Sequence, residues 1–125
     1  MIRWLGALAL ALVIPTVSSG QSPNQSGERA FQRCYSCHSV TKGETGLSGP
    51  NLYGLSGRAI AADPGFKYSK AFKNFSSANP RWTPELLDRF LTDPQAVAPG
   101  NQMGFFGLTK ADERAAIIAY LMASN

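Results

Sequence analysis

Two thiols and an imidazole lie within five consecutive residues, Cys34-Tyr35-Ser36-Cys37-His38. Thiols at this spacing, followed directly by histidine, can add to the two vinyl groups of a porphyrin and place the imidazole next to its iron. Cys34 and Cys37 are the only cysteines in the chain and His38 is the only histidine. We therefore expect one covalently attached haem c, held by Cys34 and Cys37, with His38 as an axial ligand of the iron.

Other uses of this cysteine pair fit the chain less well. A thioredoxin-like C-x-x-C lies beside a βαβ pattern, and no strand-like run flanks Cys34 or Cys37. A structural zinc site needs four ligands, usually from two separated pairs, and the chain has no second pair. A disulfide across two intervening residues closes a loop too small to stabilise the fold much. The haem interpretation is therefore favoured.

The iron of such a haem needs a sixth ligand, unless the distal position stays open. With one histidine in the chain, the candidates are a thioether, a lysine or an open site. Met1 leaves if the N-terminal segment is cleaved, so Met103 and Met122 remain. Met122 lies near the end of an apolar helical stripe, where a packing methionine is usual. Met103 lies in a segment rich in Gly and Pro, and we expect it to be the distal ligand.

The N-terminus has the pattern of an export signal. Met1-Ile2-Arg3 is a short basic region, Trp4–Ile14 is an apolar run, and Val17-Ser18-Ser19-Gly20 offers small residues for a signal peptidase. The apolar run is shorter than the ~20 residues that span a bilayer, so a retained anchor is the less favoured alternative. We expect a cleaved secretory signal at 1–20, a mature domain at 21–125, a periplasmic location, and no stable membrane insertion after cleavage.

Size and charge limit the remaining possibilities. The chain has 125 residues, enough for one domain. Its formal net charge of +4 at pH 7 falls when Arg3 is removed, and no basic stripe is present, so nucleic acid is not an expected partner. A domain of this size is marginally stable without a staple, and a covalent haem would provide one. We expect a monomer.

Helical signals occur in three places and strand signals in none. Residues 26–31 read as a short amphipathic helix, and Thr83-Pro84-Glu85 is a helix start whose apolar repeat ends at Asp93-Pro94. The segment 109–112 resembles a capping box with Asp in place of Glu, followed by an apolar stripe to the C-terminus. Residues 43–79 show no period, so we expect long loops there. The fold class is all-α, a small helical domain with long loops wrapped around one haem.

A series of short motifs, in order along the chain, resembles the class I c-type cytochromes, particularly the mitochondrial cytochrome c and bacterial cytochrome c2 branch. The matching segments are Gly27-Glu28-x-x-Phe31, Cys34 to His38, Gly49-Pro50-Asn51-Leu52-Tyr53-Gly54, Gly57-Arg58, Pro64-Gly65-Phe66-x-Tyr68, Trp82, Pro99-Gly100-x-x-Met103-x-Phe105 and Ile118-Ala119-Tyr120-Leu121. The resemblance implies the cytochrome c fold.

The resemblance also implies roles for residues around the haem. Pro50 is expected to accept a hydrogen bond from His38 through its carbonyl, which orients the ring and strengthens the ligand. Tyr68 and Trp82 are expected to donate to a buried haem propionate, with Arg58 offsetting its charge. Elsewhere, the family pattern places Gly27 and Phe31 against Tyr120, with the glycine permitting close approach of the two terminal helices.

The chain departs from the family at several positions. Phe90 stands where a tyrosine commonly bonds the ligand methionine, Phe72 replaces a frequent Asn, and Asn101 replaces a frequent Thr beside a propionate. Lysines that ring the haem edge in the mitochondrial proteins are mostly absent, which leaves Arg33, Lys42 and Lys110. We therefore do not expect the mitochondrial docking surface, and an apolar contact by Gly104, Phe105, Phe106 and Leu108 is the alternative.

If His38 and Met103 fill both axial positions, no site remains for a substrate. The resemblance then implies a periplasmic one-electron carrier, not an enzyme, that exchanges electrons with transient redox donors and acceptors. Two alternatives stay open. The chain could be the haem subunit of a larger redox enzyme, or a peroxidase or sensor with a labile distal site.

Overall fold

The computed structural model describes residues 12–16 and 20–125. The basic region, most of the apolar run and part of the cleavage region of the predicted signal therefore lie outside the described residues. Leu12, Val13 and Ile14 are exposed and belong to no helix. No helix among the described residues is long and apolar enough to cross a membrane.

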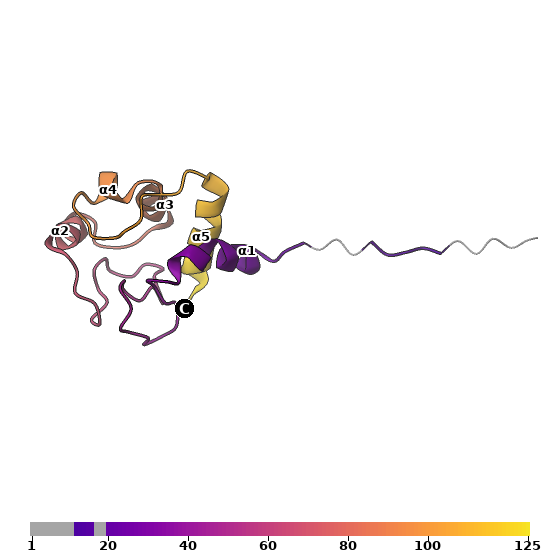
Figure 1. The fold of residues 1–125 in the computed structure, drawn as a ribbon, viewed down its shortest axis with the longest axis horizontal. Coiled ribbons are helices and arrows are strands. Elements are labelled where there is room, and N and C mark those ends of the chain that lie inside the picture. Colours follow the sequence, from indigo (N-terminus) through magenta and orange to yellow (C-terminus); the bar gives the residue numbers. More distant parts are fainter. Residues whose placement is uncertain (1–11, 17–19) are drawn as a thin grey trace, which may run out of the picture.

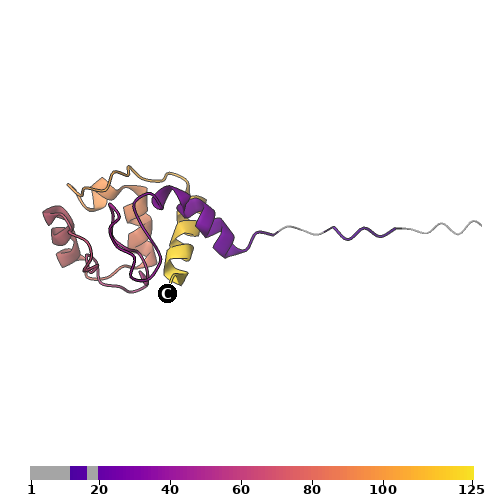
Figure 2. The same ribbon diagram turned by 60° about the horizontal axis from the view of Figure 1, so that its bottom comes forward.

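The described chain is helical, as expected for an all-α fold. The elements are α1 (Pro23–Phe31), a 3₁₀ turn η1 (Gln32–Cys34), α2 (Lys70–Ala78), α3 (Pro84–Thr92), α4 (Pro94–Val97) and α5 (Ala111–Ala123). Residues 20–125 contain no strand, only an isolated antiparallel bridge between Ala59 and Arg81. Figures 1 and 2 show α1 crossing α5 at one end of the domain, with α2 at the opposite end and long loops between them.

The α1–α5 crossing is close because Gly27 has no side chain. A Cβ added at Gly27 would lie 2.5 Å from Tyr120 Cβ and 2.7 Å from the Ala116 carbonyl oxygen. Phe31 is fully buried beside the crossing, with its ring centroid 5.4 Å from that of Tyr120. The expected packing of Gly27 and Phe31 against Tyr120 is thus confirmed.

Local sequence signals account for α3. Thr83 caps it by accepting a hydrogen bond from the Leu86 N–H at 3.1 Å, and Pro84 occupies its first turn. The apolar repeat buries Leu86, Leu87, Phe90 and Leu91. The helix ends at Thr92, and Asp93 then caps α4 by accepting from the Ala96 N–H at 3.1 Å. The expected stop at Asp93-Pro94 is confirmed.

Three expectations about the helices were wrong. The loop expected at 43–79 contains α2, because Ser69 accepts a hydrogen bond from the Phe72 N–H at 3.1 Å and starts a helix whose aromatic face joins the core. The helix expected at 26–31 begins earlier, at Pro23, because Ser22 caps it. The capping box at 109–112 does not form. The helix α5 begins at Ala111, so Lys110 and not Thr109 is at the N-cap position, and its side chain makes no capping hydrogen bond.

An aromatic cluster forms the core beneath the loops. Trp82 stands 5.4 Å from Phe90 and 6.0 Å from Phe75 between ring centroids, and Phe72 adjoins all three rings. Aromatic side chains bury large apolar areas and gain further from tilted and edge-to-face contacts. The cluster therefore packs α2 against α3, and the loop between these two helices is fixed at both ends.

Candidate haem site

The C-x-x-C-H segment continues directly from α1 as tight turns. The Cys37 and His38 N–H groups both donate to the Cys34 carbonyl, at 3.1 and 2.9 Å. Tyr35 anchors the segment to the helix crossing, because its hydroxyl lies 2.6 Å from that of Tyr120. The motif is thus wound into one compact turn that rests on the α1–α5 pair, and its three reactive side chains have a fixed relative position.

His38 is half-buried and its ring is oriented from one side. Nδ1 lies 2.7 Å from the Pro50 carbonyl oxygen. A carbonyl can only accept, so Nδ1 carries the proton and Nε2 keeps its lone pair on the neutral ring. Burial lowers the pKa of His38, an effect that the Pro50 carbonyl partly opposes. The neutral imidazole is the form that binds a metal.

Gly49 gives the imidazole its space. A Cβ at this position would lie 2.6 Å from His38 Cε1 and 2.9 Å from Nδ1. The Gly49 N–H donates to the Cys37 carbonyl at 2.8 Å, which ties the 48–52 segment to the cysteine motif. Gly49 thus forms a cradle for the ring, a role that the sequence alone did not assign to it.

The two thiols differ in their surroundings. Cys34 is partly buried, and burial raises its pKa against the opposing influence of Arg33. Cys37 is exposed, and hydrogen bonds from Ser48 and then Ser36 lower its pKa. No group of three or more His, Cys, Asp and Glu side chains that could hold a metal ion occurs in the described residues.

A cavity of about 270 Å³ lies beside His38. Five of the predicted site residues line it, and nine other residues complete the wall. The five are Cys37, His38, Pro50, Tyr68 and Met103. They come from segments far apart in the sequence, so the fold brings the two ends of the predicted site into one space. Cys34, Arg58 and Trp82 are not among the lining residues.

Arg58 and Tyr68 present polar groups that suit an anion. Arg58 donates to the Tyr53 and Asn51 carbonyls at 2.9 and 2.8 Å, while its buried Nε has no partner within the described residues. The Tyr68 hydroxyl accepts from the Asp63 N–H at 3.1 Å, which leaves its own proton free to donate. Burial raises the pKa of Tyr68, so this proton is retained. A buried unpaired N–H is costly, and a carboxylate would satisfy it.

Trp82 stands next to the segment that carries Arg58, and its donation to a propionate stays a prediction. It is buried in the aromatic cluster, and its backbone N–H donates to the Arg58 carbonyl at 3.0 Å. Trp82 thereby joins the cluster to the segment that carries Arg58.

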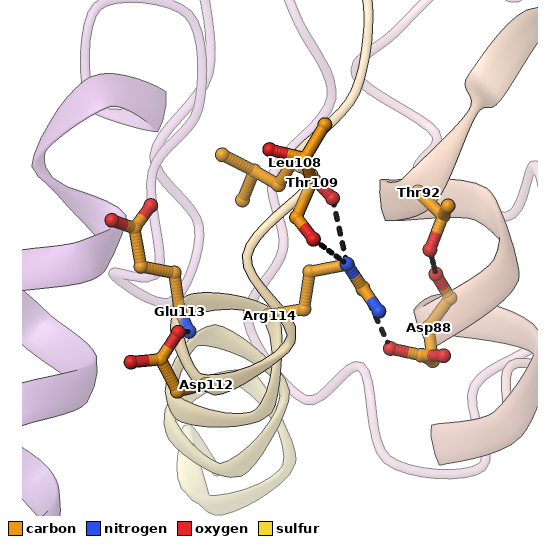
Figure 3. Close-up of polar contacts among 7 residues, drawn as sticks. All are labelled: Asp88, Thr92, Leu108, Thr109, Asp112, Glu113 and Arg114. Carbon is orange, nitrogen blue, oxygen red and sulfur yellow. Dashed lines mark hydrogen bonds and ion pairs between the residues drawn. The ribbon is translucent and has the colours of Figure 1, made fainter.

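The Met103 segment is held by polar contacts at both ends. Asn101 is buried and accepts a hydrogen bond from the Met103 N–H at 3.0 Å. At the far end, Arg114 donates to the Leu108 and Thr109 carbonyls at 2.8 and 3.1 Å and pairs with Asp88 at 2.8 Å (Figure 3). Arg114 was not found from the sequence, because it belongs to no motif with a fixed spacing, and the bond from the Met103 N–H to Asn101 was not anticipated either. The predicted place of Asn101 beside a propionate stays a prediction.

The apolar surface expected after Met103 is only partly present. Leu108 is buried in the core, so its expected exposure was wrong. Its N–H donates to the Leu91 carbonyl at 2.8 Å, a contact between distant parts of the chain that holds Leu108 against α3. Phe105 is partly buried, whereas Phe106 is 92% exposed.

The haem interpretation fits this geometry. The cavity joins Cys37 to His38 and Met103, the imidazole has a free Nε2, and Arg58 has a buried N–H without a partner. Each is a feature that a porphyrin with an iron centre and carboxylate substituents would use.

Comparison with known proteins gives the same result. Residues 25–125 match the family model described as Cytochrome c. The chain is 41% identical over 98 residues to cytochrome c2 of Agrobacterium tumefaciens, which covers 78% of this chain and 88% of that protein. It is 43% identical to cytochrome c2 of Rhodoplanes tepidamans over 78% and 96% of the two chains, and 44% identical to cytochrome c of Sesamum indicum over 78% and 86%. The chain therefore belongs to the cytochrome c family, whose members carry electrons on a covalently bound haem c.

Proposed function

We propose that residues 21–125 form a soluble periplasmic one-electron carrier with His38 and Met103 as its axial ligands. The observation that carries this proposal is the shared cavity, which both side chains line from segments far apart in the chain. Met122 packs against the core from α5 and is not among the lining residues. Of the two mature-chain methionines, Met103 is therefore the one within reach of the same site as His38.

When bound, the haem supplies exchange of a single electron between ferric and ferrous iron. The chain's own residues hold it and shape its surroundings. Cys34 and Cys37 form the thioether links, and the Pro50 carbonyl keeps the His38 Nδ1 proton in place so that Nε2 is the ligand atom. Arg58, Tyr68 and Trp82 provide donors for the propionates. With both axial positions occupied, no position is left for a substrate.

Export supports the same proposal. The pattern at 1–20 is that of a cleaved signal, and the relatives from Agrobacterium tumefaciens and Rhodoplanes tepidamans are named as cytochrome c2. We expect a monomer that meets its donors and acceptors transiently. A peroxidase or sensor is the second candidate, and the state of the distal ligand distinguishes it from a carrier.

The test compares Met103→Ala with Met122→Ala in the haem-loaded protein. Met103→Ala should remove the weak ferric charge-transfer band of sulfur ligation and allow external ligands to bind, because the thioether is gone. Met122→Ala should do neither. A band that persists in the Met103 variant would reject this ligand, and rapid ligand binding by the unmodified protein would favour the peroxidase or sensor.

A further inference from the structure

Asn101 uses its whole side-chain amide at the entrance to the Met103 segment. Its Nδ2 donates to the Pro94 and Ala98 carbonyls, at 3.0 and 2.9 Å, and its Oδ1 accepts from the Met103 N–H at 3.0 Å. The residue is 7% exposed, so water does not readily replace these bonds. The amide therefore ties the Met103 backbone to the turn formed by α4 and the residue after it.

The chemistry of these three bonds requires an amide. Two carbonyls need donors and one N–H needs an acceptor, and an asparagine supplies both on one rigid plane. An aspartate of the same shape offers acceptors to the two carbonyls and leaves them without donors. Leaving a buried polar group without a hydrogen-bond partner costs the folded protein markedly more free energy than leaving an exposed one without a partner.

The base on which Asn101 rests is itself fixed. Pro94 is fully buried. Gln95 reinforces the turn from outside, since its amide donates to the Asn101 carbonyl and accepts from the Gly100 N–H, each at 3.0 Å. Asn101 thus connects Met103 to a rigid part of α4 and not to another loop.

The thioether has little other polar support. Phe90, buried in the aromatic cluster, offers no hydroxyl to the sulfur. Beyond Met103, the next backbone bond is from the Phe105 N–H to the Met103 carbonyl at 2.8 Å, which lies within the same segment. The position of Met103 relative to the rest of the fold is therefore set nearby at Asn101 and, farther along the chain, by the bond from the Leu108 N–H to the Leu91 carbonyl and by the Arg114 contacts.

We propose that Asn101 is the positioning residue for the distal ligand: its amide holds the Met103 backbone so that the thioether stays on the iron and excludes competing ligands. This inference rests on Met103 being that ligand. Asn101 acts through Met103 and does not itself touch the iron. Its loss should therefore change the competition between the thioether and external ligands more than it changes the proximal side.

The chain contains a matched control. Asn51, on the His38 side, donates through Nδ2 to the Thr41 and Glu44 carbonyls at 2.7 and 2.9 Å and accepts from the Tyr53 N–H at 2.7 Å. This is the same pattern of two carbonyls and the N–H two residues ahead. An Asn-to-Asp change at either position removes the same kinds of bond, but only one of them lies at the distal ligand.

The experiment titrates the ferric haem-loaded protein with imidazole at neutral pH and records the sulfur charge-transfer band. Asn101→Asp should bind imidazole about tenfold more tightly or more, since one lost buried hydrogen bond suffices for such a shift, and its band should weaken. Asn51→Asp should bind imidazole as the unmodified protein does, even if denaturant unfolds it more readily. If Asn101→Asp yields no folded holoprotein, Asn101→Ser is compared with Asn51→Ser in the same way.

If the unmodified protein and the Asn101 variant bind imidazole with equal affinity, the proposal is wrong. It is also wrong if the imidazole affinity rises equally in the Asn101 and Asn51 variants, because that result would indicate general destabilisation. Met103→Ala is measured alongside. If that variant keeps its charge-transfer band, the proposed ligand itself is wrong and the positioning role falls with it. If Met103→Ala loses the charge-transfer band but the Asn101 variant binds imidazole as the unmodified protein does, Met103 is still the ligand and only the role of Asn101 is rejected.

Discussion

Gly27→Ala should destabilise the protein although alanine favours helices. The added Cβ would meet Tyr120 Cβ at 2.5 Å and the Ala116 carbonyl oxygen at 2.7 Å. One of these atoms is backbone and the other is the root of a side chain, so neither can swing aside. Relief requires α1 and α5 to move apart, which would also loosen the packing around Phe31.

The magnitude follows from two opposing terms. Overpacking a filled interface costs about 1–3 kcal/mol, and we take the upper end because backbone must move. Replacing an interior helical glycine with alanine returns about 1 kcal/mol. The free energy of unfolding should therefore fall by about 2 kcal/mol. With a guanidinium m-value of about 3 kcal/mol/M, the unfolding midpoint should drop by about 0.7 M.

The assay is guanidinium unfolding of the ferric haem-loaded protein, followed by far-UV circular dichroism and haem absorbance. Gln25→Ala is the control, since Gln25 lies in the same helix, is exposed, and is already a good helix former. Its midpoint should hardly change. If Gly27→Ala left the midpoint unchanged or raised it, the close α1–α5 contact would be refuted.

Two further predictions concern the haem and its surroundings. Haem should remain with the polypeptide after acid-acetone extraction, and complete extraction from the unmodified chain would contradict covalent attachment. Cys37→Ala should leave a single thioether link, which the mass of the haem-bearing peptide would show. The rate of association with a redox partner should depend only modestly on salt in stopped-flow measurements, because Arg33 and Lys110 both pair with Glu113, at 3.2 and 3.4 Å. Phe106→Ser should slow association several-fold, and Phe106→Leu should not. A fall of several orders of magnitude in this rate on adding salt would instead reveal a dominant cationic face.

Features set by near neighbours in the chain could be predicted well from the sequence. The Thr83 cap and the stop at Asp93 concern groups within a few residues of one another, so their hydrogen bonds depend on local geometry. The haem attachment segment is likewise local, because a covalent link needs only the correct spacing of two thiols and an imidazole. A glycine in α1 that faces Tyr120 was predictable only through the resemblance to the family.

Short-range patterns failed where a distant contact decided the outcome. The segment 70–78 has a local helix signal of its own, the Ser69 cap and apolar residues at Ala71, Phe72 and Phe75, but it stands within a long stretch rich in Gly, Pro, Ser and Asn. What its local pattern does not give is the packing of Phe72 and Phe75 against Trp82 and Phe90. Thr109 precedes a helix but does not cap it, and the adjoining Leu108 and Thr109 carbonyls are instead bound by Arg114, which Asp88 of α3 holds in place. Leu108 is also held by a distant group, because its N–H donates to the Leu91 carbonyl of α3.

The sequence by itself determined the chemistry of this protein. It contains a C-x-x-C-H segment with no other cysteine or histidine, a methionine in a segment rich in Gly and Pro, and a set of family motifs in the family's order. Only the tertiary structure decided how that chemistry is held. The free Nε2 of His38, the unpaired Nε of Arg58 and the three bonds of Asn101 each depend on groups brought together from separate segments. Residue types carry reactivity, whereas orientation requires partners whose distance in space is unrelated to their distance along the chain.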